Sequence, residues 1–455
     1  MKKEKSDTFN LLPIYSKEYL EKFEEERLSP YAMKSSRSQR LITLRDEGRH
    51  FNYRTDFQRD RDRIIHSQAF RRLKHKTQVY VPYEGDHHRT RLTHTIEVSQ
   101  ISRTLARALN LNEDLTEAIA LGHDLGHTPF GHTGEVLLNS IMQGEETLGC
   151  LDPELMSKAG GFKHNYQSLR VVDRLEKRYE YDGLNLTNPT REGIFKHTDL
   201  DSDIKYPEFK SEGLNLNLPP FLEAQAVSLA DEIAQQSHDL EDGLRAKEVP
   251  LEKVEKLAIA QEVISKLSRI YRQQTNRYLK QNMLIRGIIH LLVTNIIMHS
   301  AERIKAWAER KGIKSTDDFY QKREEIESHL ISFSAEGKKL FMEMKSFIYR
   351  YIINSFSVNR ADGRARNFLK QLFQAYFLNP RQLDSYVLLR FKEMEGITYL
   401  RDLPIKNLDR EIKRHYQNNL RFIRLICDHI AGMSDQYALR EYEKLFLPHP
   451  GIISF

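Results

Sequence analysis

The segment from Leu121 to Glu135 gathers side chains that can bind a cation or carry a proton. It reads LGHDLGHTPFGHTGE, so three His, one Asp and one Glu fall within thirteen residues. Neutral imidazoles and carboxylates form the usual ligand set for a divalent transition metal or for an ion such as Mg²⁺ or Mn²⁺. A His-Asp dipeptide alone is weak evidence, and the chain has a second one at 238–239. The density of polar groups predicts a metal-dependent or acid–base site here.

Two further segments can supply the ligands that this one lacks. Adjacent residues on a helix point about 100° apart, so a His-Asp pair can share one ion only if other segments complete the shell. The first segment is 89–98, where His94 stands near the start of a predicted helix. The second is 228–239, where three polar side chains repeat every four residues on one helix face, namely Asp231, Gln235 and Asp239.

The order of these residues resembles the metal signature H…HD…D of the HD-domain phosphohydrolases, here His94, His123-Asp124 and Asp231. The flanking sequence is similar to one group among them, the deoxynucleoside triphosphate triphosphohydrolases of the bacterial dGTPase type. Three segments carry that similarity, namely 54–79, 161–170 and 428–435. The matches keep their order from about residue 35 to residue 447, and the chain is therefore identified as a member of that family.

The resemblance implies a fold, a cofactor and a reaction. It implies an all-α HD fold and one divalent metal ion, for which Mg²⁺ or Mn²⁺ is favoured and Fe, Ni or Zn are alternatives. The implied reaction cleaves dNTPs, dGTP among them, to deoxynucleoside and inorganic triphosphate by attack of water on the α-phosphate. A homo-oligomer, either tetramer or hexamer, and regulation by a second dNTP are implied as well.

The resemblance also assigns roles to individual positions of this chain. The implied metal ligands are His94, His123, Asp124 and Asp231. The implied catalytic pair is His132 and Glu135, and the implied phosphate contacts are Arg91 and His127. The implied contacts to the deoxyribose 3′-hydroxyl are Gln78 and Asp239.

The spacing of these residues is physically reasonable for phosphoryl transfer. Arg91 lies three residues before His94, one helical turn away, so its guanidinium can reach a phosphate on the same ion. His132 lies three residues before Glu135 and would face it across a turn if this stretch is helical. A His held by a carboxylate is the usual general acid or base near neutral pH. Each residue alone also fits a purely structural role, as a core His, a helix cap or an ion-paired surface group.

Several other positions keep two interpretations. His164 and Asn165 either line the pocket for the base or are ordinary buried polar residues. Five more His are interpreted as polar residues of the surface or core without a metal role, namely His66, His75, His87, His88 and His197. Gln235 stands where many relatives carry a Tyr that leaves no room for a ribose 2′-hydroxyl. We therefore expect this chain to prefer deoxyribonucleotides over ribonucleotides by a smaller margin than those relatives, unless Tyr166 or an aromatic residue of 181–206 blocks the space of the 2′-hydroxyl instead.

The composition indicates which elements must position these residues. Only 21 Gly and 14 Pro occur in 455 residues, and 40% of the chain is hydrophobic, which predicts a mostly helical globular protein. Apolar spacing predicts helices over 93–109, 112–126, 165–179 and 221–240, and successive helices after about residue 254. We expect a lead-in at 1–34, an HD-domain core at 35–250 and a helical C-terminal region at 251–455 packed on that core.

The charge and the hydropathy of the sequence limit the classes of binding partner that we expect. The net charge is only +6, but residues 51–76 hold eight Lys or Arg against three Asp, which favours a nucleotide or a nucleic acid as partner or else a solvated helix face. The apolar run 288–298 is far shorter than the roughly 20 residues of a membrane span. Two Cys exclude a disulfide framework, and the N-terminal residues show no apolar h-region of a signal peptide, so we expect a cytoplasmic protein without a membrane partner.

Two alternatives to the dNTP hydrolase are weighed. One is a different HD phosphohydrolase, such as a nucleoside monophosphatase, a cyclic-dinucleotide phosphodiesterase or an alarmone hydrolase, and the matching flanks argue against it. The other is a scaffold that senses nucleotides or nucleic acids with a vestigial site. The intact H…HD…D set argues against that alternative.

Overall fold

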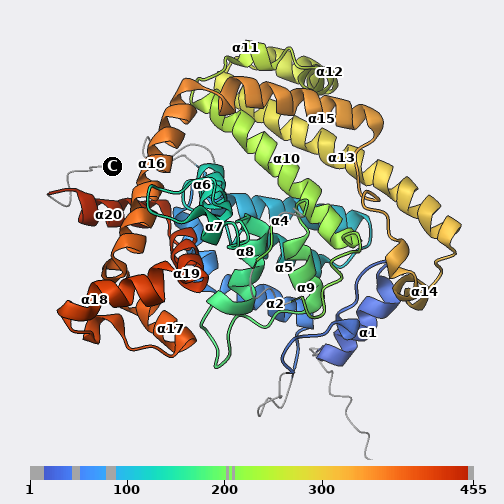
Figure 1. The fold of residues 1–455 in the computed structure, drawn as a ribbon. Helices are drawn as coiled ribbons and strands as arrows, with labels where there is room; N and C mark the ends of the chain where they lie inside the picture. The colour runs from blue at the N-terminus through green and yellow to red at the C-terminus, as the bar shows by residue number, and fades with distance from the viewer. Residues whose placement is uncertain (1–14, 44–51, 78–88, 201–203, 207–210, 449–455) are drawn as a thin grey trace, which may run out of the picture.

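The computed structural model of the chain describes residues 15–43, 52–77, 89–200, 204–206 and 211–448, and helices joined by loops make up these ranges (Figure 1). Among the described residues, the β-structure consists of two isolated antiparallel bridges, Arg40–Thr187 and Thr77–Thr90. The prediction of an all-α fold is confirmed.

Four helices form the centre of the HD core, and two of them carry Arg91, His94, Asp231 and Asp239. These are α2 (Asp56–Ile65), α4 (Arg91–Ala108), α5 (Glu113–Gly122) and α10 (Leu222–Arg245). Helix α4 packs against both α5 and α10, and α2 packs against α5 (Figure 1). The starts of α4 and α5 follow from the sequence, because the side chains of Thr90 and Asn112 accept hydrogen bonds from the backbone of the first turn.

Smaller helices surround this centre. They are α1 (Lys17–Arg27), α3 (Gln68–Arg72), α6 (Gly131–Gln143), α7 (Pro153–Met156), α8 (His164–Arg170), α9 (Asn188–Phe195), α11 (Leu251–Val254) and α14 (Thr316–Gln321). Helices α8 and α9 pack on each other, and α9 also packs on α5.

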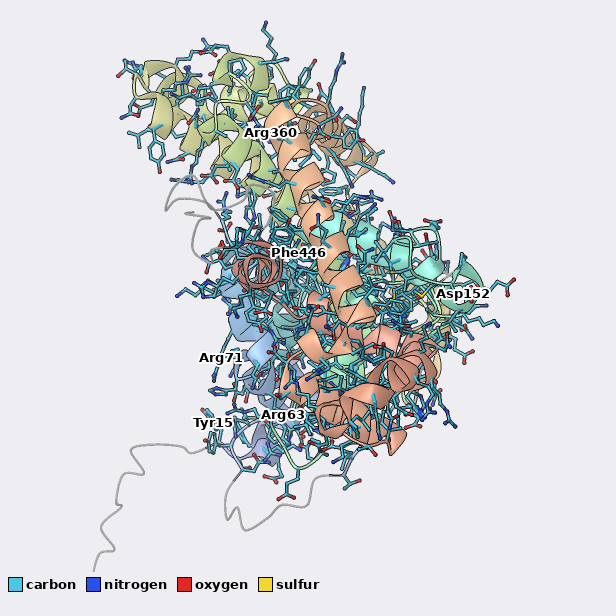
Figure 2. All side chains as sticks on the ribbon, turned by 60° about the vertical axis from the view of Figure 1, so that its left-hand side comes forward. Tyr15, Arg63, Arg71, Asp152, Arg360 and Phe446 are labelled. Atoms are coloured by element: carbon cyan, nitrogen blue, oxygen red, sulfur yellow. The ribbon has the colours of Figure 1, made fainter. Side chains whose placement is uncertain are left out.

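The C-terminal half forms two groups of helices joined by one long helix. On one side, α12 (Ala258–Gln273), α13 (Arg277–Lys311) and α15 (Ala335–Ile348) pack together with α10. On the other side lie α17 (Ser385–Glu395), α18 (Ile405–Glu411), α19 (Leu420–Ala431) and α20 (Asp435–Phe446). Helix α16 (Phe356–Leu378) runs between the two groups; in Figure 2, Arg360 marks its end near the first group.

Two apolar cores hold the described residues together. The first joins Leu105 and Ala230 of the HD core with Ile288 and Phe341 of the C-terminal half. The second joins Leu121, Leu137 and Leu169 with apolar residues of α16, α17 and α19 such as Leu369, Phe391 and Ile426. Both cores combine residues from either side of residue 250, so they do not mark a domain boundary at that position. The predicted boundary stays a prediction.

Three elements differ from the sequence-based expectation. Helix α1 lies within the predicted lead-in, and its Glu24 accepts a hydrogen bond from the backbone of Ser35. The helix predicted over 165–179 ends at Arg170 and continues only as a π-helical turn over Val171–Leu175. Helix α10 runs past Gly243, where the lack of a side chain admits Ile352 at a distance that a Cβ atom would not allow.

Helix α13 is the one candidate membrane span among the described residues, judged by its length and composition. In the structure, 44% of its most apolar 18-residue window is buried. Its apolar side chains pack into the first core together with those of α10 and α12. This packing is typical of a core helix, so the absence of a membrane partner stays our prediction.

Candidate metal centre and its surroundings

Three helices bring the four predicted metal ligands together. His94 lies on α4, His123 and Asp124 follow the end of α5, and Asp231 lies on α10. The Oδ1 atom of Asp231 is 2.9 Å from Nε2 of His94 and 3.6 Å from Nε2 of His123. The ligand atoms of His94, His123 and Asp124 all lie within 4.8 Å of one another, and these three residues are buried. Residues far apart in the sequence therefore converge on one small polar centre.

The imidazole of His123 is oriented as a metal ligand would be. Its Nδ1 atom donates to the backbone oxygen of Ala120 at 2.6 Å, while its Nε2 atom is buried without a hydrogen-bond partner among the described residues. Burial lowers the pKa of His123, but the Asp124 and Asp231 carboxylates outweigh this and raise it to about 9. Divalent cations are commonly bound by a His ring nitrogen together with carboxylate oxygens. The buried Nε2 atom of His123 and the surrounding carboxylates offer both kinds of ligand, so the residues present fit a metal ion.

Asp124 connects this centre to the two predicted phosphate contacts. Its Oδ2 atom accepts a hydrogen bond from Nη1 of Arg91 at 2.7 Å, and its Oδ1 atom is 3.2 Å from Nε2 of His127. Both partners are largely buried, and each keeps a buried nitrogen without a hydrogen-bond partner among the described residues, namely Nε of Arg91 and Nδ1 of His127. Burial, followed by the neighbouring Arg91, holds the pKa of His127 well below its usual range, so this ring is neutral.

The predicted pair of His132 and Glu135 is arranged differently from the expectation. Both lie on α6, as predicted, but the Glu135 carboxylate bonds to His164, at 2.6 Å to Nδ1 and 3.2 Å to the backbone nitrogen. His132 is exposed on the first turn of α6. Burial raises the pKa of Glu135, but the neighbouring His164 and then His132 lower it by more than burial raises it. The pKa is therefore below its ordinary value, and the carboxylate is ionised. Sequence spacing could not reveal this partner because His164 lies 29 residues away.

His164 leads from Glu135 back to the metal centre. Its ring stacks on that of His127, with centroids 4.1 Å apart and planes 14° apart. Its Nε2 atom is 3.2 Å from Nε2 of His197. His164, His127 and Asp124 form a second group whose possible ligand atoms all lie within 4.8 Å of one another.

Two His of the site were not found by sequence analysis. His197 was interpreted as an ordinary polar residue, yet it is 1% exposed, its ring centroid is 5.2 Å from that of His123, and burial lowers its pKa to about 3. No local pattern distinguishes it. His238 belongs to the second His-Asp dipeptide, and its Nδ1 atom is 3.3 Å from Nδ1 of His94. Its spacing of seven residues from Asp231 was a usable signal, because it equals two helical turns.

The predicted sugar contacts are only partly described. Gln78 lies outside the described residues. Asp239 is buried, and its Oδ1 atom has no hydrogen-bond partner among the described residues. Burial, and then the nearby Asp242, raise the pKa of Asp239 to about 8, so the acid is protonated at neutral pH and can donate a hydrogen bond. Gln235, one turn before it on α10, is exposed, whereas Tyr166 packs between Phe195 and Tyr206.

Helix α8 holds the loop that carries Asp124 and His127. The hydroxyl of Ser168 accepts a hydrogen bond from the backbone nitrogen of Gly126 at 2.8 Å and donates one to the oxygen of His123 at 2.7 Å. A Cβ atom on Gly126 would lie 2.1 Å from the backbone nitrogen of Ser168. Glycine is therefore required for the loop to approach the helix this closely.

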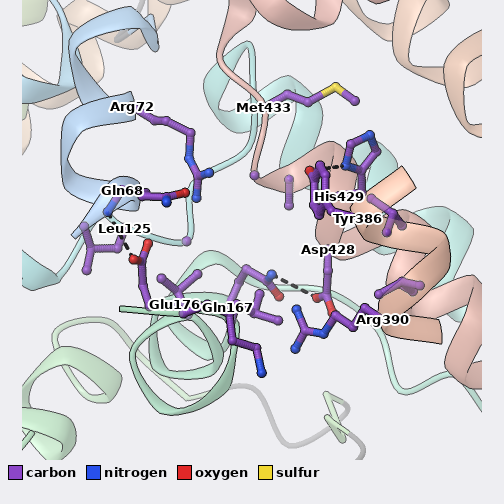
Figure 3. Close-up of a pocket in the computed structure, with 18 of the residues that line it drawn as sticks. Gln68, Arg72, Leu125, Gln167, Glu176, Tyr386, Arg390, Asp428, His429 and Met433 are labelled. Atoms are coloured by element: carbon purple, nitrogen blue, oxygen red, sulfur yellow. Dashed lines mark hydrogen bonds between the residues drawn. The ribbon is translucent and has the colours of Figure 1, made fainter. Parts of the chain in front are cut away.

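A separate cavity of about 890 Å³ lies behind this loop, between the HD core and helices α17 and α19 (Figure 3). Leu125 and Gly126 line it, while the neighbouring Asp124 and His127 point into the group of possible ligand atoms at the candidate site. Figure 3 shows Arg72 and Gln68 on one wall and Asp428, His429 and Arg390 on the other. None of the predicted site residues that the structure describes lines the cavity, so it is distinct from the described part of the candidate site.

Comparison with known proteins agrees with this geometry. The HD domain family model matches residues 91–235, and the phosphohydrolase-associated domain model matches residues 331–401 and 397–444. A deoxyguanosinetriphosphate triphosphohydrolase-like protein of Bordetella pertussis is 42% identical over 394 residues, 86% of this chain and 90% of that protein. Like-named proteins of Geobacter sulfurreducens and Nitrosomonas europaea are 36% and 39% identical and cover 96% and 92% of this chain, or 99% and 98% of their own lengths.

The chain belongs to the dGTPase-like family of HD-domain phosphohydrolases. The family predicted from the sequence is thereby confirmed. The segment matched as an HD domain begins at Arg91 and ends at Gln235, and it contains all four predicted ligands. HD domains are metal-dependent, and the cluster around His94, His123 and Asp124 can hold a metal ion.

Proposed function

We propose that this dGTPase-like protein hydrolyses dNTPs, dGTP among them, to deoxynucleoside and inorganic triphosphate. The observation that carries the proposal is the convergence of His94, His123, Asp124 and Asp231 from three helices beside the buried Arg91. An HD centre with an arginine bonded to one of its proposed ligands suits a substrate that brings several phosphate charges to one cation. The names of the similar proteins support the same substrate class.

The four convergent residues would hold one divalent ion, Mg²⁺ or Mn²⁺ in preference to Fe, Ni or Zn. When bound, this ion neutralises charge on the α-phosphate and lowers the pKa of a bound water. Around it, the protein supplies donors for the triphosphate. Arg91 keeps N–H donors beyond its bond to Asp124, whereas the neutral ring of His127 directs its one N–H, on Nε2, toward the Asp124 carboxylate and would donate to a phosphate through Nδ1 only after gaining a second proton. Both side chains are held by buried contacts before substrate arrives, which reduces the cost of organising the site.

We assign the proton transfers to the first turn of α6 and its neighbour. The leaving 5′-oxygen of the nucleoside needs a proton, and His132 is the accessible imidazole on that turn. Glu135 accepts a hydrogen bond from His164 and so fixes the ring that stacks on His127. In this proposal His132 is the general acid, and Glu135 acts through His164 to orient the phosphate-facing ring.

The sugar would lie along α10. Asp239, protonated at neutral pH, would donate a hydrogen bond to the 3′-oxygen, and Gln78 would contact the same hydroxyl. Gln235 is exposed on the same helix and has a flexible amide where relatives of the family carry a rigid ring. Tyr166 is packed into an aromatic cluster with Phe195 and Tyr206 and is therefore a poor candidate for that wall.

Incubation with all dNTPs and rNTPs, singly and in pairs, with Mg²⁺ or Mn²⁺, tests the proposal directly. We expect inorganic triphosphate and deoxynucleoside as the products and loss of turnover with a chelator. Release of orthophosphate, or cleavage of a monophosphate or cyclic dinucleotide instead, would assign the chain to another HD activity. A metal-free preparation without any turnover would favour the nucleotide-sensing scaffold. Turnover that requires a second dNTP would reveal the proposed effector, and the mass of the active species would test the tetramer or hexamer.

The same assay tests the role of Gln235. We expect the ratio of kcat/KM for dGTP over GTP to rise by about tenfold in Gln235→Tyr, because a ring is a stiffer barrier to a 2′-hydroxyl than an amide. Glu232→Gln is the control, because Glu232 lies on the same helix and is half-buried. Gln236→Tyr would not be suitable, because Gln236 is buried. An unchanged ratio in Gln235→Tyr would place the discriminating wall elsewhere.

A further inference from the structure

A short C-terminal segment, Ala431–Asp435, bonds to both backbone stretches that flank the candidate site. The Nζ atom of Lys76 donates to the backbone oxygen of Ala431 at 2.9 Å and also to that of His127. The Asp435 carboxylate accepts hydrogen bonds from the backbone nitrogens of Thr77, at 2.7 Å, and Phe130, at 2.9 Å. One segment therefore joins the stretch that ends at Thr77 to the loop between the metal centre and α6.

Asp435 is the central member of this junction. It is 2% exposed, and both of its oxygens are used. Its Oδ2 atom accepts from the backbone nitrogen and the hydroxyl of Thr77, and its Oδ1 atom accepts from Phe130. A buried carboxylate with three donors from two separate segments fixes the distance between those segments.

The bond to Phe130 sets where α6 begins. Phe130 has φ 58° and ψ 27°, a left-handed conformation that is uncommon for a bulky residue. It occupies the N-cap position of α6 without a side-chain cap, so its bond to Asp435 fixes the turn instead. His132 follows two residues later. A Cβ atom on Gly134 would lie 2.3 Å from the oxygen of Pro129, so this turn is too tightly packed to absorb a shift at Phe130.

The bond to Thr77 reaches the other side of the site. Thr77 is bridged to Thr90, and the backbone nitrogen of Arg91 donates to the oxygen of Lys76 at 3.0 Å. The same stretch leads directly into Gln78, the proposed sugar contact. A movement of Thr77 would therefore be passed to the start of α4, where Arg91 lies.

Packing and hydrogen bonds together hold the junction in place. Ala431 and Met433 are buried in the second core. Gly432, Met433 and Ser434 also line the 890 Å³ cavity (Figure 3). The hydrogen bonds of Lys76 and Asp435 add the polar contacts that tie the segment to Thr77 and to the loop before α6.

We propose that Asp435 is a positioning residue, which holds the first turn of α6 and the stretch before Gln78 in register with the metal centre. This rests on the proposed hydrolysis of dNTPs. In Asp435→Asn, one oxygen becomes an NH₂ group that cannot accept a hydrogen bond and faces a donor instead. We expect kcat for dNTP hydrolysis to fall by about 10- to 100-fold, since small misplacements of catalytic groups have effects of this size. The affinity for Mn²⁺, measured by titration calorimetry, stays within about twofold because no proposed ligand is touched.

Asp428→Asn is the matched control. Asp428 is also a largely buried carboxylate that links the C-terminal region to the HD core, but it bonds to Arg170 and Gln167 on α8. We expect this variant to lower the melting temperature and to keep kcat within about threefold of wild type. Thr77→Val removes only the hydroxyl bond and should lower kcat to an intermediate extent.

Hydrogen–deuterium exchange gives a readout that does not depend on turnover. Amides of 127–136 should exchange faster in Asp435→Asn and remain protected in Asp428→Asn. Equal kcat and equal exchange in the two variants would overturn the proposal. If Asp435→Asn does not fold, wild-type kcat in Thr77→Val would overturn it. If the wild-type protein releases no triphosphate from any dNTP, the proposed function fails, and the exchange result alone decides whether Asp435 orders this loop.

Discussion

Asp124 links the candidate metal centre to the two proposed phosphate contacts, Arg91 and His127. One carboxylate oxygen accepts from Arg91, and the other faces the imidazoles of His123 and His127. Burial opposes its charge, but Arg91 and the surrounding His hold its pKa well below the usual range. The carboxylate therefore stays ionised with or without a cation, and it orients Arg91 toward the space beside the metal centre.

The contrast between Asp231 and His132 separates metal binding from proton transfer. Asp231→Ala removes a carboxylate next to His94 and His123, so we expect loss of both hydrolysis and bound metal with little change in helix content. His132→Ala should lower kcat by about 10²–10⁴-fold, the usual contribution of a general acid, and keep the metal. Metal content per chain and steady-state kinetics check both outcomes. Normal turnover in Asp231→Ala, or metal loss in His132→Ala, would reverse the assignments.

Asp239 makes stability depend on pH in a direction that can be calculated. Its folded-state pKa of about 8 exceeds the ordinary 3.8, so the folded chain keeps a proton that the unfolded chain loses. The free energy of unfolding therefore falls as the pH rises from about 4 to about 8, by about 1.4 kcal/mol for each pH unit. The surrounding charges are Asp242, Arg89, Arg91 and Asp231. We expect Asp239→Asn to be less sensitive to pH in denaturant unfolding at pH 5 and pH 8. Parallel curves for the two proteins would contradict this.

At the scale of elements, the sequence predicts what local patterns encode and misses what distant contacts impose. Helices α4 and α5 begin within two residues of the expected positions, because their caps and apolar faces are local features. The end of α8 was wrong because Val171–Leu175 adopts a π-helical turn that no sequence period signals. In the site, the convergence of His94, His123 and Asp231 was predicted through family resemblance, whereas the partnership of Glu135 with His164 arises because the first residue of α8 lies beside α6 in the fold.

The close contact between the Asp124 loop and α8 can be tested at Gly126. A methyl group there would meet the backbone of Ser168 and His164, which cannot move aside as a side chain can. We expect Gly126→Ala to lower the free energy of unfolding by about 2–4 kcal/mol and to reduce kcat. Gly363→Ala is the control, because Gly363 lies within α16 with nothing within 4 Å of the added Cβ, and it should stabilise the protein by up to about 1 kcal/mol. Equal melting temperatures for the two variants would show that the loop can withdraw from α8.

For the whole molecule, the HD core and the C-terminal half share both apolar cores. Apolar residues of α16, α17 and α19 complete the second core, and the Ala431–Asp435 segment bonds to both stretches that flank the site. The phosphohydrolase-associated match over 331–444 covers these helices. We therefore predict that this region folds together with the HD core, and the boundary near residue 250 stays a prediction.

Expression of residues 1–250 alone tests this interdependence. The fragment keeps all proposed ligands but exposes the surfaces that Leu369, Phe391 and Ile426 cover in the full chain. Burial of each large apolar side chain contributes about 1.5–3 kcal/mol, so the loss of several exceeds the 5–15 kcal/mol by which a typical domain is stable. We expect the fragment to show no cooperative thermal transition and no dNTP hydrolysis, and the full chain under the same conditions is the control. A cooperative transition with retained metal binding would instead establish 35–250 as an independent domain and limit the C-terminal half to a regulatory role.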